Sequence, residues 1–241
     1  MIIGSVSENR EVEKRIAITP EISKKYKSLG LDICIVKNYA THLGFNDEDY
    51  LKEGVEILNS DKDVISKSNL ILQLNILDDD KLNLLKQDQS LIGALNTYLN
   101  GEKLKTLANK NINAFSLELL PRIARAQAMD ILSSQANLAG YKAVVDSFAH
   151  FEKAIPMMMT AAGTIPAAKV LIVGAGVAGL QAIATAKRMG AIVHATDVRI
   201  ASKEQVESLG GKFLMVEESE NLETEEGYAK ETSEEFKKKQ E

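Results

Sequence analysis

A glycine-rich turn is the part of this chain whose residue types and spacing most clearly indicate chemistry. The apolar run KVLIV is followed by Gly174, Gly176 and Gly179, and Val177 opens a helix-like segment. In a GxGxxG turn, the first glycine permits the turn, the second lets the backbone approach a pyrophosphate, and the third lets the helix pack closely. The helix N-terminus offers N–H groups and a partial positive charge to phosphates. This pattern predicts a dinucleotide site that includes all four residues.

An acidic residue follows at the place where such a site binds the adenosine ribose. Asp197 ends the next apolar run, IVHATD, about 20 residues after the glycines. Its carboxylate can accept hydrogen bonds from both ribose hydroxyls and would repel a 2′-phosphate, which favours NAD over NADP. Arg199 is a further candidate cofactor-binding residue, because an arginine there could bind such a phosphate. We predict bound NAD(H); the alternative is a glycine-rich turn without a ligand.

A second polar cluster precedes the glycine motif. We expect one long helix over 122–151, with Arg122 at its entrance. On such a helix Gln127 and Asp130 are three residues apart and share a face, and Ser133 lies on the other flank of Asp130. Taken from the residues alone, the cluster is as consistent with local helix pairing as with ligand binding.

Alternating apolar runs and helix-like stretches must position these residues. The sequence predicts strands at Ile2–Val6, Leu31–Val36, Asn69–Leu74, Ser90–Leu95 and Ile112–Leu117, with helices at Pro20–Leu29, Ser60–Ser66, Asp78–Lys86 and Gly101–Asn109. Strands separated by helices imply a parallel sheet covered by helices on both faces. The expected fold class is therefore α/β, with two Rossmann-like parallel-sheet domains and residues 1–121 as the first.

The second of these domains is expected to be incomplete. We place a long connecting helix and an interdomain segment at 122–165, and a partial NAD-binding domain with a charged tail at 166–241. In a doubly wound sheet of order 3-2-1-4-5-6 the first strand is central, whereas three strands alone would leave KVLIV at an open edge. A split-gene subunit, a decayed gene product and an excerpt of a longer protein all fit this expectation.

Composition narrows the classes of function. The chain has 241 residues, 45% of them hydrophobic, which suffices for a packed core. A formal charge of −5 disfavours nucleic acid as a partner. The sequence shows no apolar run of the roughly 20 residues that a membrane span needs, and its first residues lack a signal peptide, so we expect a cytoplasmic protein. We expect no metal site, and a buried thiol at the single cysteine, Cys34.

Several segments resemble one family. They are RAQAMDILSSQANLAGYKAV, MMMTAAGTIPAAKVLIVGAGVAGLQAIATAKRMGA, and ATDVR followed by KEQVESLGGKF. All resemble the NAD(H)-binding component, the α-subunit N-terminal region, of proton-translocating nicotinamide nucleotide transhydrogenase. The segments ENREVEKRIAITPEISKKYKSLG and GYAKETSEEFKKKQ resemble it too, so the likeness spans essentially the whole chain.

The resemblance implies roles for the polar cluster. Arg122, Gln127, Asp130 and Ser133 would contact NAD(H) around its nicotinamide and adjoining ribose, and Tyr228 would belong to a loop that folds over the nucleotide. Gln127 and Asp130 would be the catalytic residues, because direct hydride transfer needs orientation rather than an ionising acid or base.

The resemblance also implies partners. Hydride would pass from NADH to NADP⁺ held by an NADP(H)-binding component, and a membrane subunit would translocate protons. The protein would be a homodimer, peripheral to the inner membrane through those subunits.

Two alternatives remain open. Alanine dehydrogenase shares the architecture but needs a lysine and a histidine beside its keto acid, where this chain has Gln73 and Ala94 and keeps only Arg15. Of the three histidines, His150 and His194 occupy positions typical of structural residues, which disfavours general acid–base chemistry. The second alternative is an inactive nucleotide-binding fragment.

Overall fold

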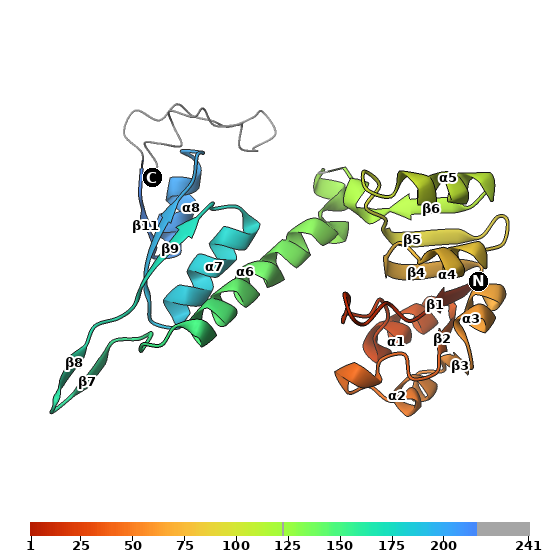
Figure 1. The fold of residues 1–241 in the computed structure, drawn as a ribbon, viewed down its shortest axis with the longest axis horizontal. Helices are drawn as coiled ribbons and strands as arrows, with labels where there is room; N and C mark the ends of the chain where they lie inside the picture. The colour runs from red at the N-terminus through yellow and green to blue at the C-terminus, as the bar shows by residue number, and fades with distance from the viewer. Residues whose placement is uncertain (122, 216–241) are drawn as a thin grey trace. The chain divides into compact units, whose positions relative to one another are not determined.

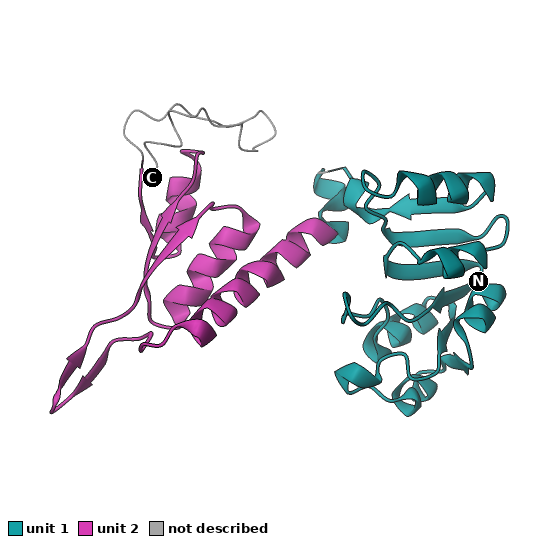
Figure 2. Ribbon diagram, viewed as in Figure 1, with its two compact units in different colours: residues 1–130 teal, residues 131–241 magenta. Residues whose placement is uncertain are grey.

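The chain divides into two compact units, residues 1–130 and residues 131–241 (Figure 2). The structure is a computed structural model that describes residues 1–121 and 123–215. Arg122, Tyr228 and the charged tail lie outside the described residues.

Unit 1 contains a six-stranded, all-parallel sheet of order β3-β2-β1-β4-β5-β6 (Figure 1). Its strands are β1 (Ile2–Ser5), β2 (Asp32–Val36), β3 (Glu56–Leu58), β4 (Leu70–Asn75), β5 (Ser90–Ala94) and β6 (Asn113–Ser116). Its α-helices are α1 (Pro20–Ser28), α2 (Asp47–Lys52), α3 (Asp61–Lys67), α4 (Asp79–Asn83) and α5 (Gly101–Asn109). This is the strand order of a doubly wound fold, with the order reversing between β1 and β4.

Local sequence explains these elements. The α1 helix has Pro20 in its first turn, Thr19 Oγ1 accepts a hydrogen bond from the Ile22 N–H at 3.2 Å, and Gly30 follows the helix at φ +76°. Apolar side chains of the central strands form the core, including fully buried Ile35 and Ile71. The five predicted strands of this unit and its four predicted helices are all present.

Residues 41–58 contain structure that the sequence did not predict. The 3₁₀-helix η1 (Thr41–Leu43), the α2 helix and the three-residue strand β3 all lie there. Elements of one or two turns, or of three strand residues, are too short to show a hydrophobic period. Tertiary contacts hold them: β3 pairs with β2, and α2 packs against β3 and α1.

The expected helix over 122–151 is shorter than predicted. Residues Ala124–Met129 form the 3₁₀-helix η3, and the α6 helix begins only at Ile131 and ends at His150. Asp130 separates them with φ −74° and ψ +89°, which is not helical. Two helices of different pitch therefore replace the single continuous one, and the division between the two units falls at the same place.

Unit 2 contains a three-stranded parallel sheet of order β11-β10-β9, packed on helices. Its elements are β9 (Lys169–Val173), α7 (Val177–Arg188), β10 (Ile192–Thr196), α8 (Ser202–Ser208) and β11 (Lys212–Phe213). A Cβ built on Gly140 of α6 would lie 2.0 Å from the Ala178 carbonyl oxygen of α7. Only a glycine there permits the close approach of these two helices.

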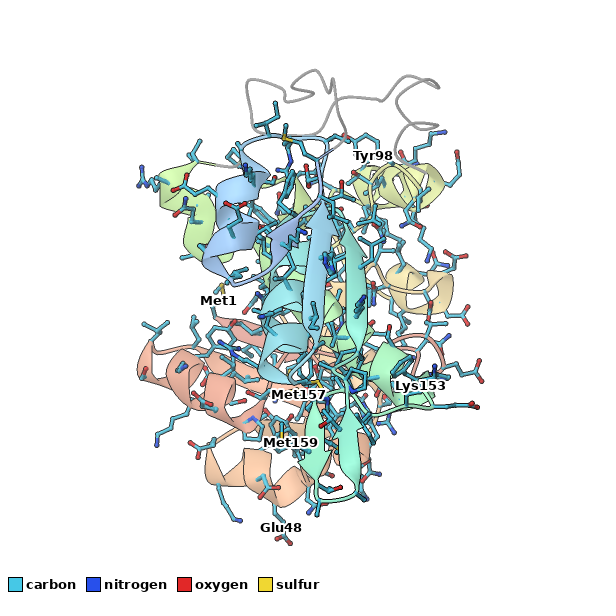
Figure 3. The ribbon with its side chains drawn as sticks, turned by 90° about the vertical axis from the view of Figure 1, so that its left-hand side faces the viewer. Met1, Glu48, Tyr98, Lys153, Met157 and Met159 are labelled. Atoms are coloured by element: carbon cyan, nitrogen blue, oxygen red, sulfur yellow. The ribbon has the colours of Figure 1, made fainter. Side chains whose placement is uncertain are left out.

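The segment before β9 forms a hairpin. The sequence suggested a plain connection, but β7 (Met158–Thr160) and β8 (Gly163–Ile165) pair antiparallel. Both strands are exposed, and Met157 and Met159 are 60% and 73% exposed (Figure 3).

One edge of the unit 2 sheet remains open among the described residues. The β9 strand pairs only with β10, as expected for three strands of a doubly wound order. Leu171 and Val173 of β9 are also 60% and 71% exposed, on the sheet face opposite to the helices, whereas Val170 and Ile172 of the same strand pack against the helix-facing core. Within residues 1–121 and 123–215, every helix is too short or too polar to cross a bilayer.

Candidate dinucleotide-binding site

The glycine turn of unit 2 joins β9 to α7. Gly174 has φ +93°, a left-handed conformation that favours glycine, and its N–H donates to the Thr196 carbonyl at 2.8 Å. A Cβ on Gly179 would lie 1.8 Å from the Gly174 carbonyl oxygen, so the helix can approach the turn only without a side chain there. The fold itself therefore requires both of these glycines.

Gly176 has a different explanation. Its φ of −75° suits any residue, and nothing lies within 4 Å of a Cβ built on it. Neither strain nor crowding therefore calls for glycine at this N-cap position of α7. The space before its backbone is open, as required where a diphosphate approaches a helix N-terminus. Because this space is open, the residues of the turn can accommodate a dinucleotide. Val177, the first helical residue, is 42% exposed beside the same space.

Asp197 lies directly after β10 and is bound to the turn. Its Oδ2 accepts a hydrogen bond from the Ala175 N–H at 2.6 Å, so its carboxylate faces the same end of the sheet as the glycines. Its side chain is only 6% exposed. Burial raises the pKa of this carboxyl, but hydrogen bonds from Arg199 and Ala175 outweigh burial and lower it below its usual value.

Arg199 pairs with the same carboxylate, a contact that the sequence did not predict. Its Nε donates to Asp197 Oδ1 at 2.9 Å and its Nη2 to Oδ2 at 3.0 Å, while its backbone N–H donates to Oδ1 at 2.8 Å. The spacing of two residues was the available signal, because an Asp-x-Arg turn can close on itself.

The predicted nicotinamide residues lie around the junction between η3 and α6. Gln127 is in η3 and exposed, Asp130 follows it and is half-buried, and Ser133 is in the first turn of α6 and half-buried. The Asp130 N–H donates to the Gln127 carbonyl at 3.2 Å. The single helix that was expected to carry these side chains is interrupted at Asp130, so Gln127 and Ser133 belong to different helices.

Sequence reasoning missed a cavity in unit 1. It has a volume of about 230 Å³ and lies at the carboxyl ends of β1 and β4, where the strand order reverses. Gln73 lines this cavity. Its Oε1 accepts hydrogen bonds from Ser5 Oγ and the Val6 N–H. Its Nε2 donates to the Val6 carbonyl and to Glu8 Oε1. Burial raises the pKa of Glu8. The reversal of strand order between β1 and β4 was the signal that could have located this cavity.

Arg15 is paired beside that cavity. Its Nε and Nη2 donate to the two carboxylate oxygens of Glu13, at 2.8 and 2.5 Å. The side-chain hydrogen bond from Arg15 lowers the pKa of Glu13 to about 2. Ala94 ends β5 and carries no polar group.

The contacts of two histidines, the cysteine and the acidic groups do not indicate a further catalytic or metal site among the described residues. His42 and His150 each donate a ring N–H to a backbone carbonyl, of Lys14 and Asp146. Cys34 is fully buried with its Sγ 3.3 Å from Ser68 Oγ, which confirms the expected buried thiol. Over the described part of the chain, no three His, Cys, Asp or Glu side chains gather closely enough to hold a metal ion.

Comparison with known proteins assigns both halves of the chain to one group. Residues 4–139 match the family profile "Alanine dehydrogenase/PNT, N-terminal domain", and residues 143–236 match "Alanine dehydrogenase/PNT, C-terminal domain". The chain is 48% identical over 245 residues to the first part of NAD(P) transhydrogenase subunit alpha from Rickettsia prowazekii. That alignment covers all of this chain and 64% of the relative, so the chain spans less than two thirds of it.

Solved structures of the same group superpose on this chain. A transhydrogenase from Sinorhizobium meliloti superposes with a TM-score of 0.85 at 44% identity, over 90% of this chain and 64% of that one. An L-alanine dehydrogenase superposes with a TM-score of 0.77 at 23% identity, over 89% of this chain and 60% of that one, which shows a common fold.

Proposed function

The chain belongs to the alanine dehydrogenase/PNT family, and we propose that it is the NAD(H)-binding component of an NAD(P) transhydrogenase. The observation that carries the proposal is the turn at Gly176, where an open backbone faces outward beside the Asp197 carboxylate. A diphosphate would bind at the N-terminus of α7, and Asp197 would accept hydrogen bonds from the adenosine ribose. The relatives named transhydrogenase support this assignment.

The reaction proposed is hydride transfer from NADH to NADP⁺, giving NAD⁺ and NADPH. The dihydronicotinamide supplies the hydride, and NADP⁺ on a partner component accepts it, so no proton is exchanged at the reacting carbons. Gln127 would hold the carboxamide, and Asp130 with Ser133 would bind neighbouring groups. Arg122 and Tyr228 are assigned by resemblance to the same nucleotide. Orientation of this kind raises the effective concentration of the reacting atoms.

Partners and location belong to the same proposal. An NADP(H)-binding component would accept the hydride, and a membrane component would translocate protons. The chain would form a homodimer and lie at the membrane surface through these subunits. The domain boundaries at 1–121, 122–165 and 166–241 are proposed from the order of strands and helices in the sequence, with residues 166–241 binding the nucleotide.

Contacts in unit 1 argue against alanine dehydrogenase chemistry. A keto acid carboxylate would need a cation, and it would have to compete with Glu13, whose two oxygens the guanidinium of Arg15 binds. Gln73 is 3% exposed and uses its amide to join β1 to β4. Neither it nor Ala94 can protonate or deprotonate a substrate at neutral pH.

Two measurements test the function. Titration with NADH should saturate, and NADPH should bind at least tenfold more weakly. Addition of an NADP(H)-binding component should then allow NADPH to reduce an NAD analogue. Binding without exchange would favour the inactive-fragment alternative, whereas NADH oxidation dependent on pyruvate and ammonia would favour alanine dehydrogenase.

A further inference from the structure

The carboxylate proposed to bind ribose already has its hydrogen-bonding capacity in use. Oδ1 of Asp197 accepts from the backbone N–H and Nε of Arg199, and Oδ2 accepts from the Ala175 N–H and Arg199 Nη2. A carboxylate has about four lone-pair positions. Each oxygen here receives two donors.

Two of these donors are fixed and two are replaceable. The N–H groups of Ala175 and Arg199 belong to the backbone of the turn and of the segment after β10, so they stay when a ligand binds. The guanidinium donors are on a rotatable side chain that is 20% exposed. The positions they occupy are the ones left for two ribose hydroxyls.

We propose that Arg199 competes with the coenzyme for Asp197: its guanidinium must leave the carboxylate before the adenosine ribose can bind. This inference rests on the proposed NAD(H) site. Arg199 therefore lowers the affinity for NADH instead of adding a contact. Because the guanidinium must leave first, the competition slows association of the nucleotide.

A simple electrostatic role makes the opposite prediction. An arginine near a diphosphate attracts the anion, so its removal would weaken NADH binding. Competition predicts that removal strengthens binding, because the ribose no longer has to replace a paired, charge-assisted donor set. The sign of the change therefore separates the two roles.

The test compares Arg199→Met and Arg199→Lys with wild type, and Arg188→Met serves as a control. Arg188 is exposed at the end of α7, away from the turn, so its substitution removes the same charge. For Arg199→Met we expect NADH to bind about tenfold more tightly, mainly through faster association in stopped-flow fluorescence, because no side chain has to leave Asp197 first. Arg199→Lys, which cannot form the two-pronged pair, should be intermediate, and Arg188→Met unchanged.

The affinity of the same variants for NADPH provides a second test. Because Asp197 remains in Arg199→Met, its charge still opposes a 2′-phosphate, and NADPH should not gain affinity. If wild type binds NADH but Arg199→Met binds it equally or more weakly, the proposed competition is wrong and the NAD(H) site itself stands. If neither wild type nor the variant binds NADH, the proposed NAD(H) site fails together with it.

A measurement on the wild type covers the case of a variant that does not fold. The Arg199 Nε–H should exchange slowly with water in the free protein, because it is bonded to Asp197. Saturation with NADH should speed this exchange in nuclear magnetic resonance spectra. Retained protection in the NADH complex contradicts the proposal.

Discussion

At the scale of single residues, carboxylates in similar surroundings behave differently because their donors differ. Asp197 and Glu13 are both nearly buried, and each is bound by an arginine two residues further along the chain. Only Asp197 also reaches a glycine turn, through the Ala175 N–H. We therefore expect Asp197 to affect the coenzyme and Glu13 to affect stability.

Replacement of Asp197 by Asn should weaken NADH binding by about tenfold or more, because hydrogen bonds to a charged group contribute roughly 1.5–3 kcal/mol. The affinity for NADPH should fall less, since the charge that opposes a 2′-phosphate is gone. Fluorescence titration of both coenzymes measures the two changes. Glu204→Gln, an exposed acid of α8, is the control. Equal NADH affinity in Asp197→Asn and wild type would refute this role.

Replacement of Glu13 by Gln should flatten the response of stability to acid. The folded-state pKa of Glu13 is about 2, below the ordinary value of 4.5. A lowered pKa stabilises the folded protein above pH 4.5, and the contribution is lost as the pH falls from there toward 2. Urea unfolding midpoints between pH 7 and pH 3 should therefore decline more in wild type than in Glu13→Gln. The exposed Glu11→Gln should decline as wild type does.

At the scale of elements, the glycine turn separates structural from functional requirements. Gly179→Ala should destabilise the protein by about 1–3 kcal/mol, because its Cβ meets the Gly174 carbonyl. Gly176→Ser should leave stability unchanged or raise it, since serine is a favoured N-cap, yet it should weaken NADH binding by filling the space before the turn. Melting temperatures and NADH titrations distinguish these outcomes. NADH binding that survives Gly176→Ser would place the diphosphate elsewhere.

At the scale of the whole molecule, the exposed apolar face of β9 in unit 2 should govern association. Exposed apolar surface promotes contact between chains, and Leu171 is 60% exposed on the face of β9 opposite to the helices. Leu171→Lys should reduce concentration-dependent light scattering of the purified chain. Val12→Lys, which adds the same charge at an 83% exposed site of unit 1, should not. Equal scattering in both variants would mean that β9 is not the associating surface.

The sequence by itself determined the βαβ unit, the glycine turn, Asp197 and most strands of unit 1. Each depends on local signals: apolar runs, caps, and glycine at a left-handed turn, as at Gly174. It also indicated the open edge at β9, since the order of strands follows from the doubly wound pattern.

Only the tertiary structure decided which side chains meet. The pairing of Arg199 with Asp197, the bonds of Gln73 across β1 and β4, and the end of the helix at Asp130 depend on distances that no residue pattern encodes. The reason is physical: secondary structure follows from neighbours along the chain, whereas the partners of a buried polar group are whichever donors the packing brings within reach.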